Sequence, residues 1–103
     1  MNFGQAIEAL KNGRMVIRSS WTEDRKFIFQ QVPSTINKEI VPKMQSLPQS
    51  VKDYFQRTFD SPSEQIDSIY YSNQIAHVGT SNMITGYAPS PEDSLSEDWV
   101  IVD

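Results

Sequence analysis

The chain has 103 residues, of which 38% are hydrophobic and 11% aromatic, and its formal net charge is −4. This length predicts a single domain, residues 1–103. The acidic balance argues against duplex nucleic acid as a partner but leaves a small anionic ligand open. The sequence has no cysteine, which excludes disulfides and thiolate metal sites. No apolar run approaches the ~20 residues of a membrane span, so we expect a cytoplasmic protein without a membrane partner.

The first predicted element is a short helix at the N-terminus. Asn2 is a favourable cap, Gln5 stands in the capping-box position, and Asn12-Gly13 supplies a left-handed stop. The apolar residues that recur at helical spacing are Phe3, Ala6, Ile7 and Leu10. One face of this helix is therefore expected to be buried.

Two strands follow the helix. From Arg14 to Arg18 the hydrophobic period is two, and a second strand is predicted at 27–32. Residues 19–26 join them and contain Trp21 among polar residues. Trp21 is either folded back as a lid on the core or held out for a ligand, and both interpretations stay open.

Residues 33–65 are predicted to be an insertion. Four of the six prolines lie there, which is typical of a loop-rich excursion. A helix is expected to start at Leu47-Pro48, with Val51, Tyr54 and Phe55 on one side. Such an amphipathic stripe is more often core packing than a partner site.

Further strand signals lie at 66–71, 74–78 and 83–87, and the last two flank a turn at 79–82. The element order predicts an α+β fold, with a small antiparallel sheet, an N-terminal helix, the inserted helix and a short C-terminal helix.

The C-terminal helix has a clear start. Ser90 can cap it, Pro91 suits its first position, and Asp93 stands where a capping-box partner belongs. Asp98 and Trp99 then lead into an apolar tail that predicts a closing strand.

The sequence contains few residues that could form a catalytic site. His77 is the only histidine, no cysteine accompanies it, and no Gly-x-Ser-x-Gly elbow is present. Capping and the helix dipole explain the acidic residues near the C-terminal helix. We therefore expect no catalytic site, no metal and no cofactor.

Three segments in the same order carry a family resemblance: residues 1–13, which start Met-Asn-Phe-Gly, residues 16–21, which end Arg-Ser-Ser-Trp, and residues 86–99, which end Glu-Asp-Trp. They resemble a family of small phage and prophage domains that includes the second group of Thoeris anti-defence proteins. The match covers about half of the chain. Tyr87 stands where the family usually has tryptophan, and Ser94 and Ser96 replace its common apolar residue and alanine.

The resemblance implies a sponge rather than an enzyme. Characterised anti-defence members bind cyclic ADP-ribose isomers made by Toll/interleukin-1-receptor-type immune enzymes and keep this signal from its effector. Some members hold cyclic oligonucleotides at a second site. The family forms homotetramers with ligand pockets between subunits, so a small cyclic nucleotide and further copies of the chain are the expected partners.

Three groups of side chains match such a ligand. Aromatic platforms suit the purine, cations and the start of the C-terminal helix suit the pyrophosphate, and carboxylates or polar side chains suit the ribose hydroxyls. Arg25 lies close to this set in sequence. The expected ligand-binding residues are Trp21, Tyr87 and Phe27 for the base, Arg18, Lys26 and Ser90 for the pyrophosphate, and Asp93, Asn82 and Thr80 for the riboses.

An alternative function stays open. In this alternative, the chain is an oligomeric phage protein-interaction module without a nucleotide ligand. A third and more distant hypothesis is an enzyme that acts on the same nucleotide.

Overall fold

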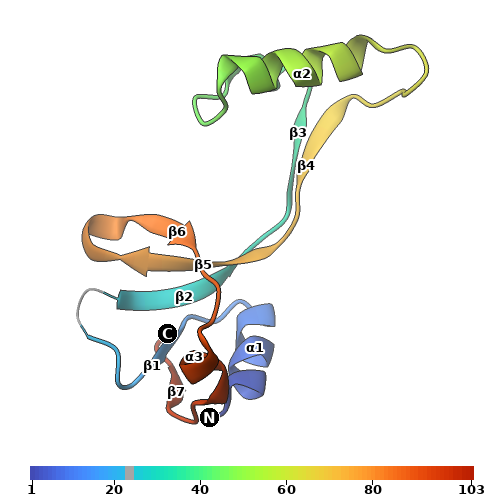
Figure 1. Ribbon diagram of the computed structural model, residues 1–103. Helices are drawn as coiled ribbons and strands as arrows, with labels where there is room; N and C mark the ends of the chain where they lie inside the picture. The colour runs from blue at the N-terminus through green and yellow to red at the C-terminus, as the bar shows by residue number, and fades with distance from the viewer. Residues whose placement is uncertain (23–24) are drawn as a thin grey trace. The chain divides into compact units, whose positions relative to one another are not determined.

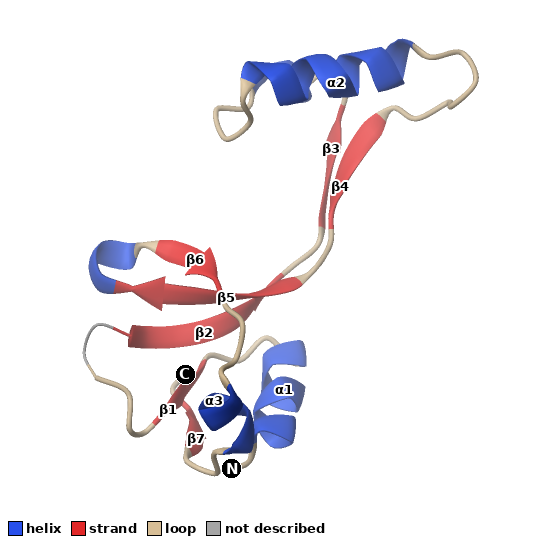
Figure 2. Ribbon diagram, in the orientation of Figure 1, coloured by secondary structure: helices blue, strands red, loops and turns tan. Residues whose placement is uncertain are grey.

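The computed structural model describes residues 1–22 and 25–103. Its helices and strands are shown in Figures 1 and 2. The chain forms two compact units, one made of Met1–Val32 with Asn73–Asp103 and the other of Pro33–Ser72. The predicted insertion 33–65 lies inside the second unit. The α+β class is confirmed, and so are the three predicted helices.

The first unit is built on a five-stranded antiparallel sheet in the order β6-β5-β2-β1-β7. Two helices belong to this unit, one near each end of the chain. Its elements are α1 (Phe3–Lys11), β1 (Val16–Arg18), β2 (Arg25–Gln31), β5 (Gln74–Gly79), the 3₁₀ turn Thr80–Asn82, β6 (Ile84–Gly86), α3 (Pro91–Leu95) and β7 (Trp99–Ile101).

The second unit contains a two-stranded antiparallel sheet and one helix. Its elements are β3 (Ser34–Asn37), the 3₁₀ turn Val41–Lys43, α2 (Gln49–Asp60) and β4 (Ser68–Tyr71). The sequence did not predict β3, because Ile36 is its one apolar residue and no alternation is visible. Pairing with β4, which places Ile36 opposite Ile69, defines this strand.

The predicted cap of α1 is confirmed. The Asn2 Oδ1 accepts the backbone N–H of Gln5 at 2.8 Å, and the Gln5 side chain accepts the backbone N–H of Asn2 at 2.9 Å. Gly13 follows the helix with φ +80°, a conformation that glycine adopts without a Cβ penalty. Ala6 and Leu10 are buried, so the predicted apolar face of α1 packs on the sheet.

Trp99 lies at the centre of the core of the first unit and is fully buried. Its ring contacts Phe3 and Trp21, each with a centroid separation of 5.2 Å. Its indole Nε1 donates to the backbone carbonyl of Asp93 at 3.0 Å. The amino group of Met1 donates to the Trp99 carbonyl at 2.8 Å, which ties the start of the chain to its last strand. The other buried members of this core are Ala6, Ala9, Leu10, Val16 and Ile28.

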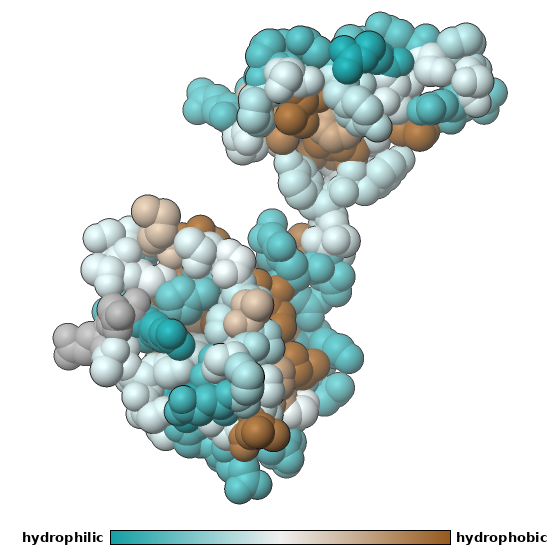
Figure 3. Space-filling view, viewed as in Figure 1, coloured by the Kyte–Doolittle hydropathy of each residue, from teal (hydrophilic) through white to brown (hydrophobic). Residues whose placement is uncertain are grey.

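Apolar side chains also reach the surface, and Figure 3 shows hydrophobic areas on both units. Leu95 is 83% exposed in the first unit, and Tyr70 is 69% exposed in the second. No residue of α2 is fully buried, although its apolar residues lie on one side. The core of this small chain is therefore limited, and Trp99 contributes a large share of it.

Replacement of Trp99 by alanine is expected to lower the free energy of unfolding by about 3–5 kcal/mol, the usual cost of removing a buried large aromatic side chain. Urea unfolding followed by circular dichroism measures this change. Leu95→Ala is the matched control, because Leu95 is exposed and its loss should cost no more than about 0.5 kcal/mol. Equal stability losses in the two variants would contradict the central position of Trp99.

Candidate functional site

A buried ion-pair cluster joins β1 to the C-terminal part of the first unit. The Arg18 side chain at the end of β1 is only 11% exposed. Its Nη1 donates to Asp93 Oδ1 at 2.8 Å, and its Nε donates to Asp98 Oδ1 at 2.8 Å. One guanidinium therefore fixes α3 and the turn before β7 against the central sheet.

Asp93 is buried, and both of its carboxylate oxygens have partners. Oδ1 accepts from Arg18, and Oδ2 accepts the hydroxyl of Tyr87 at 2.8 Å. Its backbone N–H donates to Ser90 Oγ at 3.0 Å, which confirms Ser90 as the cap of α3. Its carbonyl accepts from the indole of Trp99. Asp93 of the short helix α3 therefore takes part in the ion pair with Arg18, in the N-cap at Ser90 and in the hydrogen bond from Trp99.

The ionisation states follow from these contacts. The hydrogen bond from Arg18, aided by Ser20, lowers the pKa of Asp98 to about 2. Burial acts to raise the pKa of Asp93, but hydrogen bonds from Arg18 and Tyr87 outweigh it and the net shift is downward. Burial and the hydrogen bond to Asp93 raise the pKa of Tyr87. At neutral pH Asp93 and Asp98 are therefore ionised, and Tyr87 is protonated.

Aromatic rings line the space beside this cluster. Trp21 meets His77 and Tyr87 edge to face, with centroid separations of 6.2 and 6.0 Å. The guanidinium of Arg25 lies over the Trp21 ring, 5.1 Å from its centroid. Trp21 Nε1 and His77 Nε2 are buried and have no hydrogen-bond partner among the described residues. These two nitrogens are unpaired in the described part of the chain, although neither of them is open to solvent.

Two hollows open at this place. One has a volume of about 250 Å³, and the other has a volume of about 410 Å³. Arg25, Ser90 and Asp93 line both hollows. His77 and Tyr87 line only the first hollow, and Arg18 and Trp21 line only the second. The shared residues make the two hollows neighbouring parts of one candidate site.

The structure brings five of the nine expected ligand residues together at this site. They are Arg18, Trp21, Tyr87, Ser90 and Asp93. Their roles as ligand contacts stay predictions. Arg18 is already engaged by the three carboxylates of Glu92, Asp93 and Asp98, and the cap engages one of the backbone N–H groups that Ser90 was expected to leave open. Trp21 is half-buried and packs against the core, which fits the lid, and it also lines a hollow, which fits the ligand role.

The other four expected residues line neither hollow. Lys26 is exposed on β2. Phe27 pairs with Phe29 at a centroid separation of 6.2 Å, and strand alternation places both on the face opposite the buried Ile28. Thr80 and Asn82 lie in the exposed 3₁₀ turn between β5 and β6.

Sequence reasoning missed two residues of this site. Arg25 was noted as a nearby cation but was not among the expected ligand residues, and a register irregularity between Arg25 and Phe27 interrupts the alternation that would place both on one face. His77 was read as a structural residue of a strand. Its pairing with Thr85 and Ile28 gives it a place on the inner face of the sheet, beside Trp21. No local pattern signals either contact.

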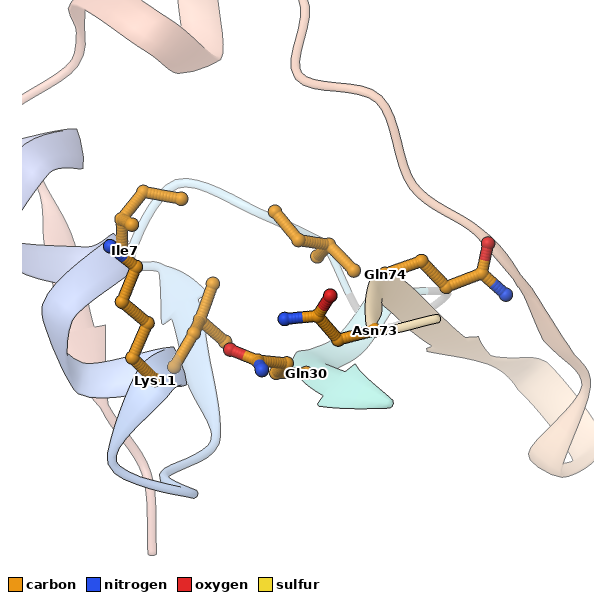
Figure 4. A pocket seen from close by; sticks show the side chains of 7 residues that line it. Ile7, Lys11, Gln30, Asn73 and Gln74 are labelled. Carbon is orange, nitrogen blue, oxygen red and sulfur yellow. The ribbon is translucent and has the colours of Figure 1, made fainter. Parts of the chain in front are cut away.

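A third hollow of the first unit has a different character. Figure 4 shows Ile7 and Lys11 of α1 on one side and the amides of Gln30 and Asn73 on the other. Its volume is about 190 Å³, and none of its lining residues is aromatic. It offers a base no stacking platform, so the site around Arg25 is the better candidate for a nucleotide.

The structure is that of a small α+β domain with a candidate site lined by aromatic residues and arginines. Comparison with known proteins shows which family the chain belongs to. A model of the Thoeris anti-defense 2-like domain matches residues 1–102. The Thoeris anti-defense 2 protein of Bacillus phage SP01 is 30% identical over 102 residues, which cover 99% of this chain and 94% of that protein. The chain therefore belongs to the Thoeris anti-defense 2-like family, whose role is phage anti-defence.

In the described ranges 1–22 and 25–103, no helix is long and apolar enough to cross a bilayer. Within the same ranges, no group of three or more histidine, cysteine or acidic residues is placed to hold a metal ion.

The depressed pKa of Asp98 predicts a pH-dependent stability. A carboxylate with a folded pKa of about 2 stabilises the fold above its unfolded pKa and loses this effect as the pH falls through about 2. Asp98→Asn should therefore be less stable than the wild type at neutral pH, and the difference should shrink below the unfolded pKa of about 3.9. Urea unfolding at a series of pH values measures this.

Glu97→Gln is the matched control for Asp98→Asn. Glu97 is the exposed neighbour of Asp98 and has no ion pair with Arg18. Its substitution should leave the pH profile close to that of the wild type. If Asp98→Asn and Glu97→Gln gave the same profile, the ion pair with Arg18 would not be the source of the effect.

Proposed function

We propose that this chain is a sponge that binds a cyclic ADP-ribose-type signalling nucleotide and withholds it from a Thoeris effector, without cleaving it. Family membership supports the anti-defence role. The observation that carries the finer proposal is the placement of Arg25 over Trp21, beside two unpartnered buried nitrogens. A cation beside an aromatic ring suits the phosphates and the base of a nucleotide.

The site matches the parts of the ligand as follows. A purine finds aromatic surface at Trp21 and Tyr87, where stacking is worth about 1–3 kcal/mol per base. The pyrophosphate finds Arg25, whose side chain is exposed and whose planar fork suits phosphate oxygens.

Binding without cleavage follows from how the titratable groups are used. Asp93 and Asp98 are held ionised by Arg18, and Asp93 has a partner on each oxygen. A general acid or base must exchange its proton near neutral pH, which these carboxylates do not favour. His77 packs edge to face against Trp21, and its ring faces no acidic partner in the described residues. The site therefore suits capture better than turnover.

A preformed site also suits a sponge. The Arg18 contacts and the Ser90 cap fix Asp93 and Tyr87 before any ligand arrives. A binder that is ordered in advance loses less conformational entropy on binding, which leaves more of the contact energy as affinity. Tight capture is what competition with an effector demands.

The remaining parts of the proposal rest on the family resemblance. We propose that the protein acts in the cytosol of the phage-infected host cell and assembles as a homotetramer. A second site for cyclic oligonucleotides belongs to the same set of proposals. The competing candidate, a protein-interaction module, is favoured by the exposed apolar residues Leu95 and Tyr70.

Retention of intact ligand tests the proposal against this alternative. The wild-type protein is mixed with a cyclic ADP-ribose isomer, separated from free ligand, and then heat-denatured. We expect the supernatant to contain the unchanged nucleotide, identified by mass spectrometry. A hydrolysed product would make the chain an enzyme, and the absence of retained nucleotide with any isomer would favour the interaction module.

A pair of neighbouring substitutions tests the assigned cation. Arg25→Gln should weaken nucleotide binding at least tenfold, or about 1.4 kcal/mol, because it removes the guanidinium beside Trp21. Lys26→Gln is the matched control, since it removes the same charge from an exposed residue that lines neither hollow. Isothermal titration calorimetry gives both affinities. An equal loss in the two variants would point to general electrostatic attraction rather than to this site.

A further inference from the structure

The larger hollow of the candidate site, with a volume of about 410 Å³, carries charges of both signs. Among the residues that the structure describes, its charged lining side chains are Arg18, Arg25, Glu92 and Asp93. Arg18 and Asp93 are buried and bonded to each other at 2.8 Å. Arg25 and Glu92 are exposed. These two side chains therefore present their charges to a molecule that enters the hollow.

Glu92 adds negative charge that Arg18 does not require. Its Oε1 lies 3.5 Å from Arg18 Nη1, and its side chain is 81% exposed. Arg18 makes closer contacts, at 2.8 Å each, with Asp93 and Asp98. The guanidinium charge is thus already offset by two buried or half-buried carboxylates. With Arg25 included, two arginines stand beside three carboxylates, which is an unusual balance for a site that takes an anionic ligand.

The start of α3 differs in the same direction from a phosphate-binding helix. Phosphate groups bind where a helix leaves free N–H groups and the positive end of its dipole. In α3, Glu92 and Asp93 both stand in the first turn, and Ser90 Oγ accepts the N–H of Asp93. The positive end of this short helix is therefore compensated by carboxylates of the chain itself.

We propose that Glu92 determines which nucleotides the site accepts, by repelling terminal phosphate groups. This inference rests on the proposed function, because it requires that the site binds a nucleotide. In cyclic ADP-ribose both phosphates are internal, since each is linked on two sides. ADP and ATP instead end in a terminal phosphate, a group that carries up to about two negative charges at neutral pH. Arg25 suits an internal pyrophosphate, whereas the additional charge of a terminal phosphate meets Glu92.

Such a selection would matter to a sponge. ADP and ATP share the adenine, a ribose and the pyrophosphate of the signal, so they would compete for Trp21 and Arg25. Even in bulk water, the repulsion between two unit charges about 4 Å apart lowers a binding constant roughly fivefold. One exposed carboxylate at the hollow therefore keeps the site open to nucleotides that have no terminal phosphate.

Glu92→Gln tests the proposal, because it removes the charge and keeps the shape of the side chain. In magnesium-free buffer, its affinity for ADP should exceed that of the wild type at least fivefold. The gain should be larger than any gain for a cyclic ADP-ribose isomer, and isothermal titration calorimetry measures both. Rising salt should reduce the difference between the two proteins for ADP, because salt screens the repulsion. Glu92→Lys should raise the affinity for ADP further.

Glu97→Gln is the matched control, since it removes the same charge from an exposed residue that lines neither hollow of the site. It should leave the affinity for ADP at the wild-type value, and circular dichroism verifies that every variant is folded. Equal gains in Glu92→Gln and Glu97→Gln would overturn the proposal, because net charge would then explain them.

The remaining outcomes separate this inference from the proposed function. An unchanged or lower affinity of Glu92→Gln for ADP would overturn the role of Glu92, and a wild type that retains the cyclic nucleotide would still support the sponge. A wild type that binds no cyclic isomer, together with a gain of ADP binding in Glu92→Gln, would overturn the sponge and support the role of Glu92. If neither protein bound either nucleotide, both proposals would fail.

Discussion

The buried ion pair between Arg18 and Asp93 is the contact on which the geometry of the first unit depends. It joins β1 to a helix of five residues that is too short to hold its own conformation. A buried charge that loses its partner is strongly unfavourable, because desolvation is no longer compensated. Asp93 also accepts the hydroxyl of Tyr87 and, through its carbonyl, the indole of Trp99. The ion pair with Arg18, the N-cap of α3 and the hydrogen bond from Trp99 therefore all involve Asp93.

This arrangement explains how a small domain can fix the residues of the candidate site without a large core. The ion pair fixes the inner residues, and Arg25, Trp21 and His77 line the two hollows beside them. Capture of a ligand at this site, as proposed above, agrees with the anti-defence role of the family.

The sequence predicted the features that depend on local patterns. The cap at Ser90, the capping box at Asn2 and the α+β class are all visible as short-range signals. The site was predicted only in part, because its geometry comes from long-range contacts. Arg18 looked like a free cation, but Asp93 and Asp98, far along the chain, occupy it. Lys26 and its neighbour Arg25 were indistinguishable by charge and spacing, and the fold places only Arg25 at the hollows.

The two tryptophans of the chain allow the most direct test of the central claim. Trp99 Nε1–H is bonded to the Asp93 carbonyl, whereas Trp21 Nε1–H has no partner among the described residues. An ¹⁵N-labelled sample therefore reports each indole as a separate NMR signal. On titration with a cyclic ADP-ribose isomer, the Trp21 signal should shift strongly and the Trp99 signal should stay nearly in place. No shift of the Trp21 signal, or a shift of the Trp99 signal alone, would contradict the account.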